Sequence, residues 1–193
     1  GTDPEMTIAA LSNQRPIMKR RATLLVTGPV ALLLLAAGVT AGMMGFRINL
    51  TPSEPLGLWR IAPIGRPVRN GDLVFICPPG TDAMRLARKR GYLRSGLCPE
   101  GIAPLIKTVV ALAGQSVTVG EEVRIDGRRL DHSHVMRRDG KGRPLIAYRG
   151  GVVPADAVFL HSDFPGSFDS RYFGPLPVAG ILGLAREVWT YAP

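Results

Sequence analysis

The hydrophobic and polar positions divide this chain into two unlike parts. Between Arg21 and Arg47, residues 22–46 form one continuous stretch without a charged side chain. A helix that crosses a bilayer needs ~20 such residues, whereas the apolar part of a cleavable signal peptide is about 7 to 15 residues long. The stretch therefore predicts a transmembrane helix over 22–46, which Gly28-Pro29 would kink, and a signal peptide is the alternative.

After Arg47 the pattern changes to short apolar runs, most of them bounded by Gly or Pro, which is typical of strands. We predict one mainly β domain over residues 47–193, a length that suits a single core. The predicted strands are 72–76, 105–112, 116–119, 122–125, 158–161 and 186–191. Asp126-Gly127 supplies the positive φ of a tight hairpin turn.

One helix is predicted within this β pattern. Thr81 or Asp82 can cap its start, and Gly91 can end it. Its apolar face carries Ala83, Leu86 and Ala87, and its other face carries Arg85, Arg88 and Lys89. The role of this basic helix stays open between a plain solvated surface and a contact with lipid or substrate.

The charge distribution predicts an orientation. The first five residues, Gly-Thr-Asp-Pro-Glu, resemble the remnant of an expression tag. Basic residues concentrate in segment 6–21, before the apolar stretch, so the positive-inside rule places the amino terminus in the cytoplasm and residues 47–193 outside. For a bacterial inner membrane that compartment is the periplasm. The net charge of +9, without a nucleic-acid-binding module, favours contact with anionic lipid or an acidic partner.

The cysteines Cys77 and Cys98 flank the predicted helix. An exported domain meets an oxidising compartment, so we predict a disulfide between them. Their spacing lacks a zinc pattern, and His132 and His134 are better interpreted as loop residues. We expect neither a metal nor another cofactor.

Lys107 carries the strongest chemical signal. It lies inside Pro-Leu-Ile-Lys-Thr-Val-Val-Ala-Leu, residues 104–112, which reads as a buried strand. Because desolvation disfavours the ammonium form, a lysine in such a place can lose its proton near neutral pH and act as a general base. A base of this kind needs a nucleophile.

Two further segments could supply the partners of Lys107. Ser53 stands between Pro52 and Pro55, and the prolines restrict the local backbone and would hold its hydroxyl in a defined direction. Asp169 and Arg171, two residues apart near the carboxyl end, can form an ion pair. Each segment alone also fits a purely structural role.

Taken together, these segments resemble the signal-peptidase family of Ser-Lys serine proteases, most closely its conjugative-transfer branch, the TraF-type peptidases. The likeness covers nearly the whole chain in a specific order. It comprises the anchor, Asn-x-Thr-x-Ser-x-Pro-x-Gly-Leu-Trp at 49–59, Gly-Asp-Leu-Val at 71–74, Cys-Pro-Pro at 77–79, Arg-Gly-Tyr-Leu at 90–93, the Lys107 strand, and Ser-x-Asp-Ser-Arg-Tyr-x-Gly at 167–174.

The resemblance implies a signal-peptidase-like, β-rich catalytic domain that lies against the outer membrane surface. It implies that Ser53 is the nucleophile and Lys107 the general base. Ser167 matches the serine that orients the lysine amine. The Thr51 hydroxyl and the Ser53 backbone N–H match the oxyanion hole. Asp169 and Arg171 match a supporting ion pair.

The expected function is therefore a membrane-anchored serine endopeptidase that processes, and in this branch can cyclise, the pilin precursor of a conjugation apparatus. Other channel components are further possible partners. Glu54-Pro55 after the serine, and His161-Ser162-Asp163 in place of the usual Gly-Asp-Asn-Arg run, depart from general signal peptidases. Three alternatives stay open: a general signal peptidase, a non-enzymatic anchored domain that binds a secretion channel, and a triad of Ser53, His161 and Asp163 or Asp169.

Overall fold

The computed structural model describes the backbone of residues 14–192 and the side chains of residues 27–192. The predicted tag remnant and the first part of the predicted cytoplasmic segment 6–21 lie outside the described residues. The chain divides into two compact units, Gly1–Met44 and Gly45–Pro193. We call the second one the β unit.

The first unit contains helix α2, Gln14–Met43, with Pro29 inside it. Its described apolar side chains are exposed, and they include Val30, Leu32–Leu35, Val39 and Met43. Within residues 27–192, where side chains are described, no helix has the length and apolarity needed to cross a membrane.

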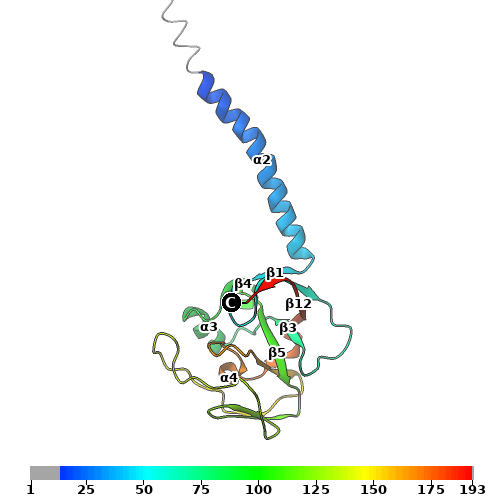
Figure 1. The fold of residues 1–193 in the computed structure, drawn as a ribbon, viewed down its shortest axis with the longest axis vertical. Helices are drawn as coiled ribbons and strands as arrows, with labels where there is room; N and C mark the ends of the chain where they lie inside the picture. The colour runs from blue at the N-terminus through cyan, green and yellow to red at the C-terminus, as the bar shows by residue number, and fades with distance from the viewer. Residues whose placement is uncertain (1–13, 193) are drawn as a thin grey trace, which may run out of the picture. The chain divides into compact units, whose positions relative to one another are not determined.

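The β unit is mainly β, as the short apolar runs predicted, and its larger sheet has seven strands. Their spatial order is β1-β2-β12-β3-β5-β10-β11, and the neighbours are antiparallel. Figure 1 shows β3, β5 and β12 within this unit. The bounds are β1 Phe46–Asn49, β2 Leu56–Ala62, β3 Leu73–Ile76, β5 Leu105–Ala111, β10 Ala157–His161, β11 Leu176–Pro177 and β12 Ile181–Tyr191.

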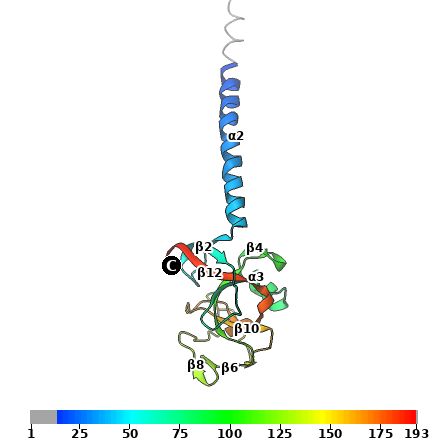
Figure 2. The same ribbon diagram turned by 90° about the vertical axis from the view of Figure 1, so that its right-hand side faces the viewer.

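A second sheet of four strands has the order β8-β7-β6-β9. It lies at the end of the β unit away from β2 and β12 (Figure 2). The bounds are β6 Ser116–Val119, β7 Val123–Ile125, β8 Arg128–Arg129 and β9 Gly151–Val152. Asp126 and Gly127, between β7 and β8, have φ values of 49° and 79°. This confirms the predicted tight turn.

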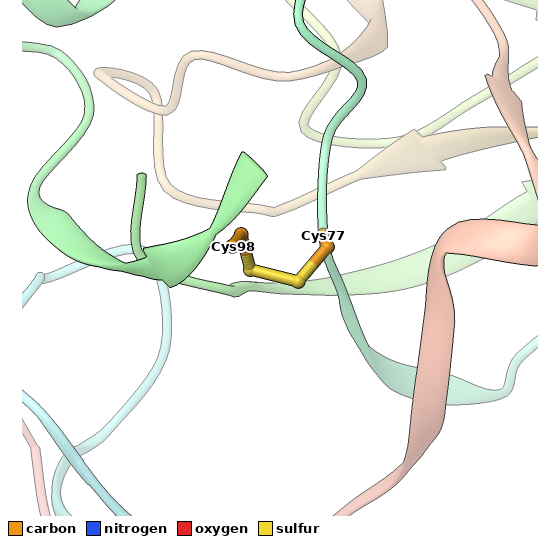
Figure 3. The surroundings of a disulfide bond; sticks show 2 residues. All are labelled: Cys77 and Cys98. Carbon is orange, nitrogen blue, oxygen red and sulfur yellow. A yellow bond between two sulfur atoms is a disulfide. The ribbon is translucent and has the colours of Figure 1, made fainter. Parts of the chain in front are cut away.

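Helix α3, Asp82–Lys89, confirms the predicted helix, but its buried face is Met84 and Ala87, so the prediction of Leu86 and Ala83 on the apolar face was wrong: both are exposed. The Thr81 side chain accepts a hydrogen bond from the Met84 N–H at its start, and Gly91 follows its end with φ 83°. Cys77, after β3, is joined to Cys98 at the end of β4, Ser95–Cys98, by the predicted disulfide (Figure 3). Their Cα atoms are 5.4 Å apart, so the bridge fixes both ends of the segment that carries α3.

Three short helical turns complete the unit: η1 Pro99–Gly101, α4 Ser170–Phe173 and η2 Val178–Gly180. The largest cluster of buried apolar residues brings together side chains from β3, β5, β10 and α3, among them Val74, Val109, Leu160 and Met84. A second cluster, around Trp59, Phe75 and Ile106, covers the opposite face of β3 and β5. The two clusters hold these strands from both faces.

Some strand limits differ from the sequence prediction. β12 begins at Ile181, whereas the prediction began at Arg186, and it pairs with both β2 and β3. Strands β1 and β2, which flank Ser53, were not predicted. Their residues show no clear alternation of buried and exposed positions, and pairing with β1 and β12 identifies β2 as a strand.

Candidate active site

Ser53 lies in the loop 50–55 that joins β1 to β2. The two strands form an antiparallel hairpin in which Asn49 is opposite Gly57. The Asn49 side chain, 8% exposed, is inside the loop. Its Nδ2 donates to the carbonyl oxygens of Thr51, Glu54 and Pro55 at 2.9–3.0 Å. Its Oδ1 accepts from the Thr51 backbone N–H and hydroxyl.

A contact from a distant segment holds the loop from another direction. The Ser162 hydroxyl donates to the Ser53 carbonyl oxygen at 2.5 Å. Ser162 directly follows His161, the last residue of β10, which is opposite Thr108 of β5. Thr108 is the neighbour of Lys107. Pairing of β5 with β10, together with this hydrogen bond, therefore places the Ser53 loop near the part of the sheet that carries Lys107.

Lys107 is in the middle of β5, opposite Val74 of β3, and only 3% of it is exposed. The pKa of its amine is lowered from 10.5 to about 8: burial lowers it, Asp169 and Glu54 raise it, and Arg171 lowers it. Half of Lys107 is therefore neutral at about pH 8, in the direction that the apolar run around it predicted.

Glu54 directly follows the candidate nucleophile and is half-buried. The pKa of its carboxyl is raised to about 7: burial raises it most, the neighbouring Lys107 lowers it, and Asp163 and Glu187 raise it. The mutual electrostatic influence of Glu54 and Lys107 is a second indication that the loop and β5 meet. Protonation of the two groups is coupled.

Asp169 and Arg171 form a fully buried ion pair, 2.8 Å between Arg171 Nη2 and Asp169 Oδ2. Burial by itself would raise the pKa of Asp169, but His161 and Arg171 beside it lower it below its ordinary value. The Asp169 carboxylate also accepts from the backbone N–H groups of Ser162 and Arg171. The predicted pairing is confirmed.

Arg171 uses its remaining N–H groups on backbone carbonyls. Nη1 donates to His134 at 2.9 Å, and Nη2 donates to Ser167 and Phe164 at 3.3 Å. The buried pair therefore organises the segment 162–167, and through the Ser162 hydroxyl it supports the Ser53 loop. This geometry fits a structural supporting role better than direct chemistry.

His161 is 2% exposed and lies between two carboxylates. Its Nδ1 is 3.5 Å from Asp169 and its Nε2 is 3.6 Å from Asp163. Neither nitrogen has a hydrogen-bond partner among the residues described. No hydrogen bond joins His161 to Ser53 among the described residues. The Ser-His-Asp alternative therefore lacks the His–Ser hydrogen bond that would support it.

The hydroxyls of Ser167 and Thr51, the other two predicted site residues, differ in their hydrogen bonds. The Ser167 hydroxyl is buried and, within the described part of the chain, has no hydrogen-bond partner, so its expected orientation of Lys107 stays a prediction. The Thr51 hydroxyl lies 2.7 Å from Asn49 Oδ1. Since that oxygen only accepts, the hydroxyl donates to it and must turn before it can serve an oxyanion.

Sequence reasoning did not assign roles to Asn49, Ser162 or Glu54, which lie in or contact the Ser53 loop. Asn49 is the first residue of the motif at 49–59, but nothing in the spacing of the motif shows that the Asn49 amide group faces inward. Ser162 is more than a hundred residues from Ser53. Only the assembly of the larger sheet, in which β12, β3 and β5 lie between β2 and β10, brings Ser162 to the loop.

The comparison with protein families matches residues 19–190 to the family described as signal peptidase, peptidase S26. A solved structure of a signal peptidase I from Enterococcus faecalis V583 has a TM-score of 0.38 and 20% identity, and the match covers 62% of this chain and 97% of that one.

Several curated proteins are similar over almost their full length. A probable conjugal transfer protein TraF from Sinorhizobium fredii is 62% identical, and the match covers 91% of this chain and 94% of that protein. A conjugal transfer protein TraF from Agrobacterium tumefaciens is 56% identical, covering 90% and 98%. A plasmid transfer protein TraF from Escherichia coli is 38% identical, covering 91% and 98%.

Proposed function

The chain belongs to the signal peptidase family, peptidase S26, and we propose that it is a membrane-anchored serine endopeptidase with a Ser53–Lys107 dyad. Its proposed substrate is the pilin precursor of a conjugation apparatus. The similar proteins named for conjugal or plasmid transfer support this substrate class over the many exported proteins of a general signal peptidase.

The observation that carries the proposal is the buried amine of Lys107, with a pKa of about 8. A lysine with no role in chemistry would be expected at the surface, where its ammonium is hydrated. Here the amine is enclosed in β5, near the loop that carries a serine. A neutral amine in such a place is suited to accept the serine proton.

Acylation follows from these two groups. Neutral Lys107 takes the proton of the Ser53 hydroxyl while the oxygen attacks the carbonyl carbon of the scissile bond. The Ser53 backbone N–H stabilises the developing oxyanion, and the Thr51 hydroxyl joins it after turning from Asn49. The peptide C–N bond then breaks, and the Lys107 ammonium gives its proton to the leaving amine. An ester on Ser53 remains.

The ester has two possible fates. Water gives a linear product, with Lys107 again taking the proton. An amine held close to the ester gives a new peptide bond, because positioning raises its effective concentration by orders of magnitude. Our proposal includes attack by the substrate's own amino terminus, which closes the pilin into a circle.

The proposed anchor is the uncharged stretch 22–46, most of which is in α2. A face of the β unit adds a second apolar surface. Ile48 of β1 and Trp189 of β12 are both opposite Leu58 of β2, and they are 70% and 72% exposed. Leu50 and Tyr191 are exposed as well. Trp and Tyr beside aliphatic residues favour a membrane interface, which would bring the Ser53 loop to substrates leaving the bilayer.

The proposal is tested by co-expressing the full chain with a candidate conjugative pilin precursor and measuring the intact mass of the pilin. A circular product is one water lighter than the matching linear chain and lacks a free amino terminus. A linear product with a readable terminus would retain the endopeptidase and remove the cyclase. The matched control is Ser53→Ala, which should leave the precursor unprocessed.

Two other results would point elsewhere. Release of signal peptides from many exported proteins would favour a general signal peptidase. Pilin processing that Ser53→Ala leaves unchanged would indicate that another protein is the peptidase and that this chain is a binding domain.

A further inference from the structure

The Asn49 side chain makes five hydrogen bonds, all to the loop that carries Ser53. Its amide group donates to the carbonyls of Thr51, Glu54 and Pro55. Its oxygen accepts two bonds from Thr51. A carboxamide has two N–H hydrogens and two lone pairs, so this set uses its entire capacity, with one hydrogen shared. No part of the group is left to bind a ligand.

The bonded groups stand on both sides of the nucleophile. Thr51 is two residues before Ser53, and Glu54 and Pro55 follow it. Pro52 and Pro55 lack an N–H, which limits the hydrogen bonds that the loop can make within itself. The inward-facing amide group of Asn49 supplies hydrogen bonds in place of these missing ones. It is held in place by β1, because its own residue is paired with Gly57.

We propose that Asn49 is a positioning residue for the proposed peptidase reaction, which fixes the Ser53 loop in the conformation that attacks the substrate. The proposal rests on the Ser53–Lys107 assignment. Asn49 touches neither substrate nor reacting atoms. It acts by fixing the direction of the Ser53 hydroxyl and of the Ser53 backbone N–H, while Ser162 holds the Ser53 carbonyl from the other side.

Asn49 also determines the state of the Thr51 hydroxyl. In the structure this hydroxyl donates to Asn49 Oδ1, which fixes its orientation. Rotation of the Thr51 side chain is then enough to direct the hydroxyl at an oxyanion. Without Asn49 the hydroxyl would adopt several orientations, and fewer molecules would be ready to stabilise the transition state.

The experiment compares two substitutions that remove different halves of the array. Asn49→Ala removes all five bonds. Asn49→Asp keeps the acceptor for Thr51 but replaces the donor to the three carbonyls by a repelling oxygen. Asn70→Ala is the matched control, because Asn70 makes one exposed side-chain bond, to Gln115. Each full-length variant is purified in detergent and assayed with the pilin precursor.

A misplacement of about 1 Å can reduce a rate by about 10²-fold. We therefore expect kcat per folded molecule to fall about 10- to 100-fold in both Asn49 variants, with KM within about threefold and, in the uncharged Asn49→Ala, the pH step of Lys107 unmoved. Asn70→Ala should keep wild-type kcat. A purely structural role would instead lower the melting temperature and leave kcat per folded molecule unchanged.

Hydrogen exchange provides a readout that does not depend on activity. The Thr51 amide should exchange faster in Asn49→Ala but remain protected in Asn49→Asp, where its acceptor persists. Unchanged exchange in Asn49→Ala would show that Asn49 does not hold the Ser53 loop in place, whether or not the protein cleaves pilin. Faster exchange with wild-type kcat overturns the catalytic role alone. If wild-type protein with a protected loop cleaves nothing, the proposed function fails, and with it the positioning role.

Discussion

The pH dependence of cleavage tests the role of Lys107 directly. The perturbation is titration of the wild-type enzyme together with the substitution Glu54→Gln, which removes a carboxylate that raises the pKa of Lys107. If neutral Lys107 is the base, as proposed, lowering its pKa should extend activity to lower pH. The sign of the expected shift is therefore fixed by the structure.

The magnitude follows from the pKa of about 8. At pH 7 roughly one Lys107 in eleven is neutral, and at pH 9 roughly ten in eleven are, because one pH unit changes the ratio of the two forms tenfold. We expect kcat/KM to rise about tenfold between these values and to level off above them. A surface lysine with a pKa of ~10.4 would still be mostly charged at pH 9.

Glu54→Gln should move this rise to lower pH and increase kcat/KM at pH 7. It should also simplify the profile, because the carboxyl of Glu54 has a pKa of about 7 and titrates in the same range as Lys107. In the wild-type enzyme the two titration steps belong to the coupled pair of Glu54 and Lys107. In Glu54→Gln only the titration of Lys107 remains.

The assay is the initial rate of pilin cleavage at low substrate concentration from pH 6 to pH 10, where kcat/KM reports the free enzyme. Circular dichroism at each pH confirms that the protein is folded. A step near ~6.5, the ordinary pKa of histidine, that disappears in His161→Ala would refute the assignment of Lys107 as the base. A shift of the Glu54→Gln profile to higher pH would refute the electrostatic reasoning.

Other substitutions test the remaining groups. Lys107→Arg should be inactive while folded, because the guanidinium stays protonated, and retained cleavage in the rate assay would point to another base. Arg171→Leu should destabilise the protein by about 3–5 kcal/mol in urea unfolding, since the buried Asp169 loses its partner; an unchanged midpoint would contradict this. Reduction of the Cys77–Cys98 bridge should cost about 3 kcal/mol in the chain-entropy model and speed hydrogen exchange in α3 before it affects the Ser53 loop. Free-thiol labelling of both cysteines in protein from its native compartment would show that the bridge does not form there.

The sequence by itself determined the local elements that depend on neighbouring residues. The cap at Thr81, the glycine after α3 and the Asp126-Gly127 turn are encoded by conformational preferences of single residues, so they were predicted correctly. The burial of Lys107 was also readable, because a strand of apolar residues has to be buried on at least one face. The disulfide followed from the presence of two cysteines beside one helix.

Tertiary structure alone decided how the candidate site is held together. The contact of Ser162 with Ser53 depends on the antiparallel register of β5 and β10, and register is a property of two strands that no single segment contains. The inward direction of Asn49 depends on its pairing with Gly57 across the hairpin. The sequence left His161 open as a member of a triad, and only the tertiary structure places it between Asp163 and Asp169 with no hydrogen bond to Ser53. Side-chain types set which chemistry is possible, and long-range strand pairing sets which groups meet.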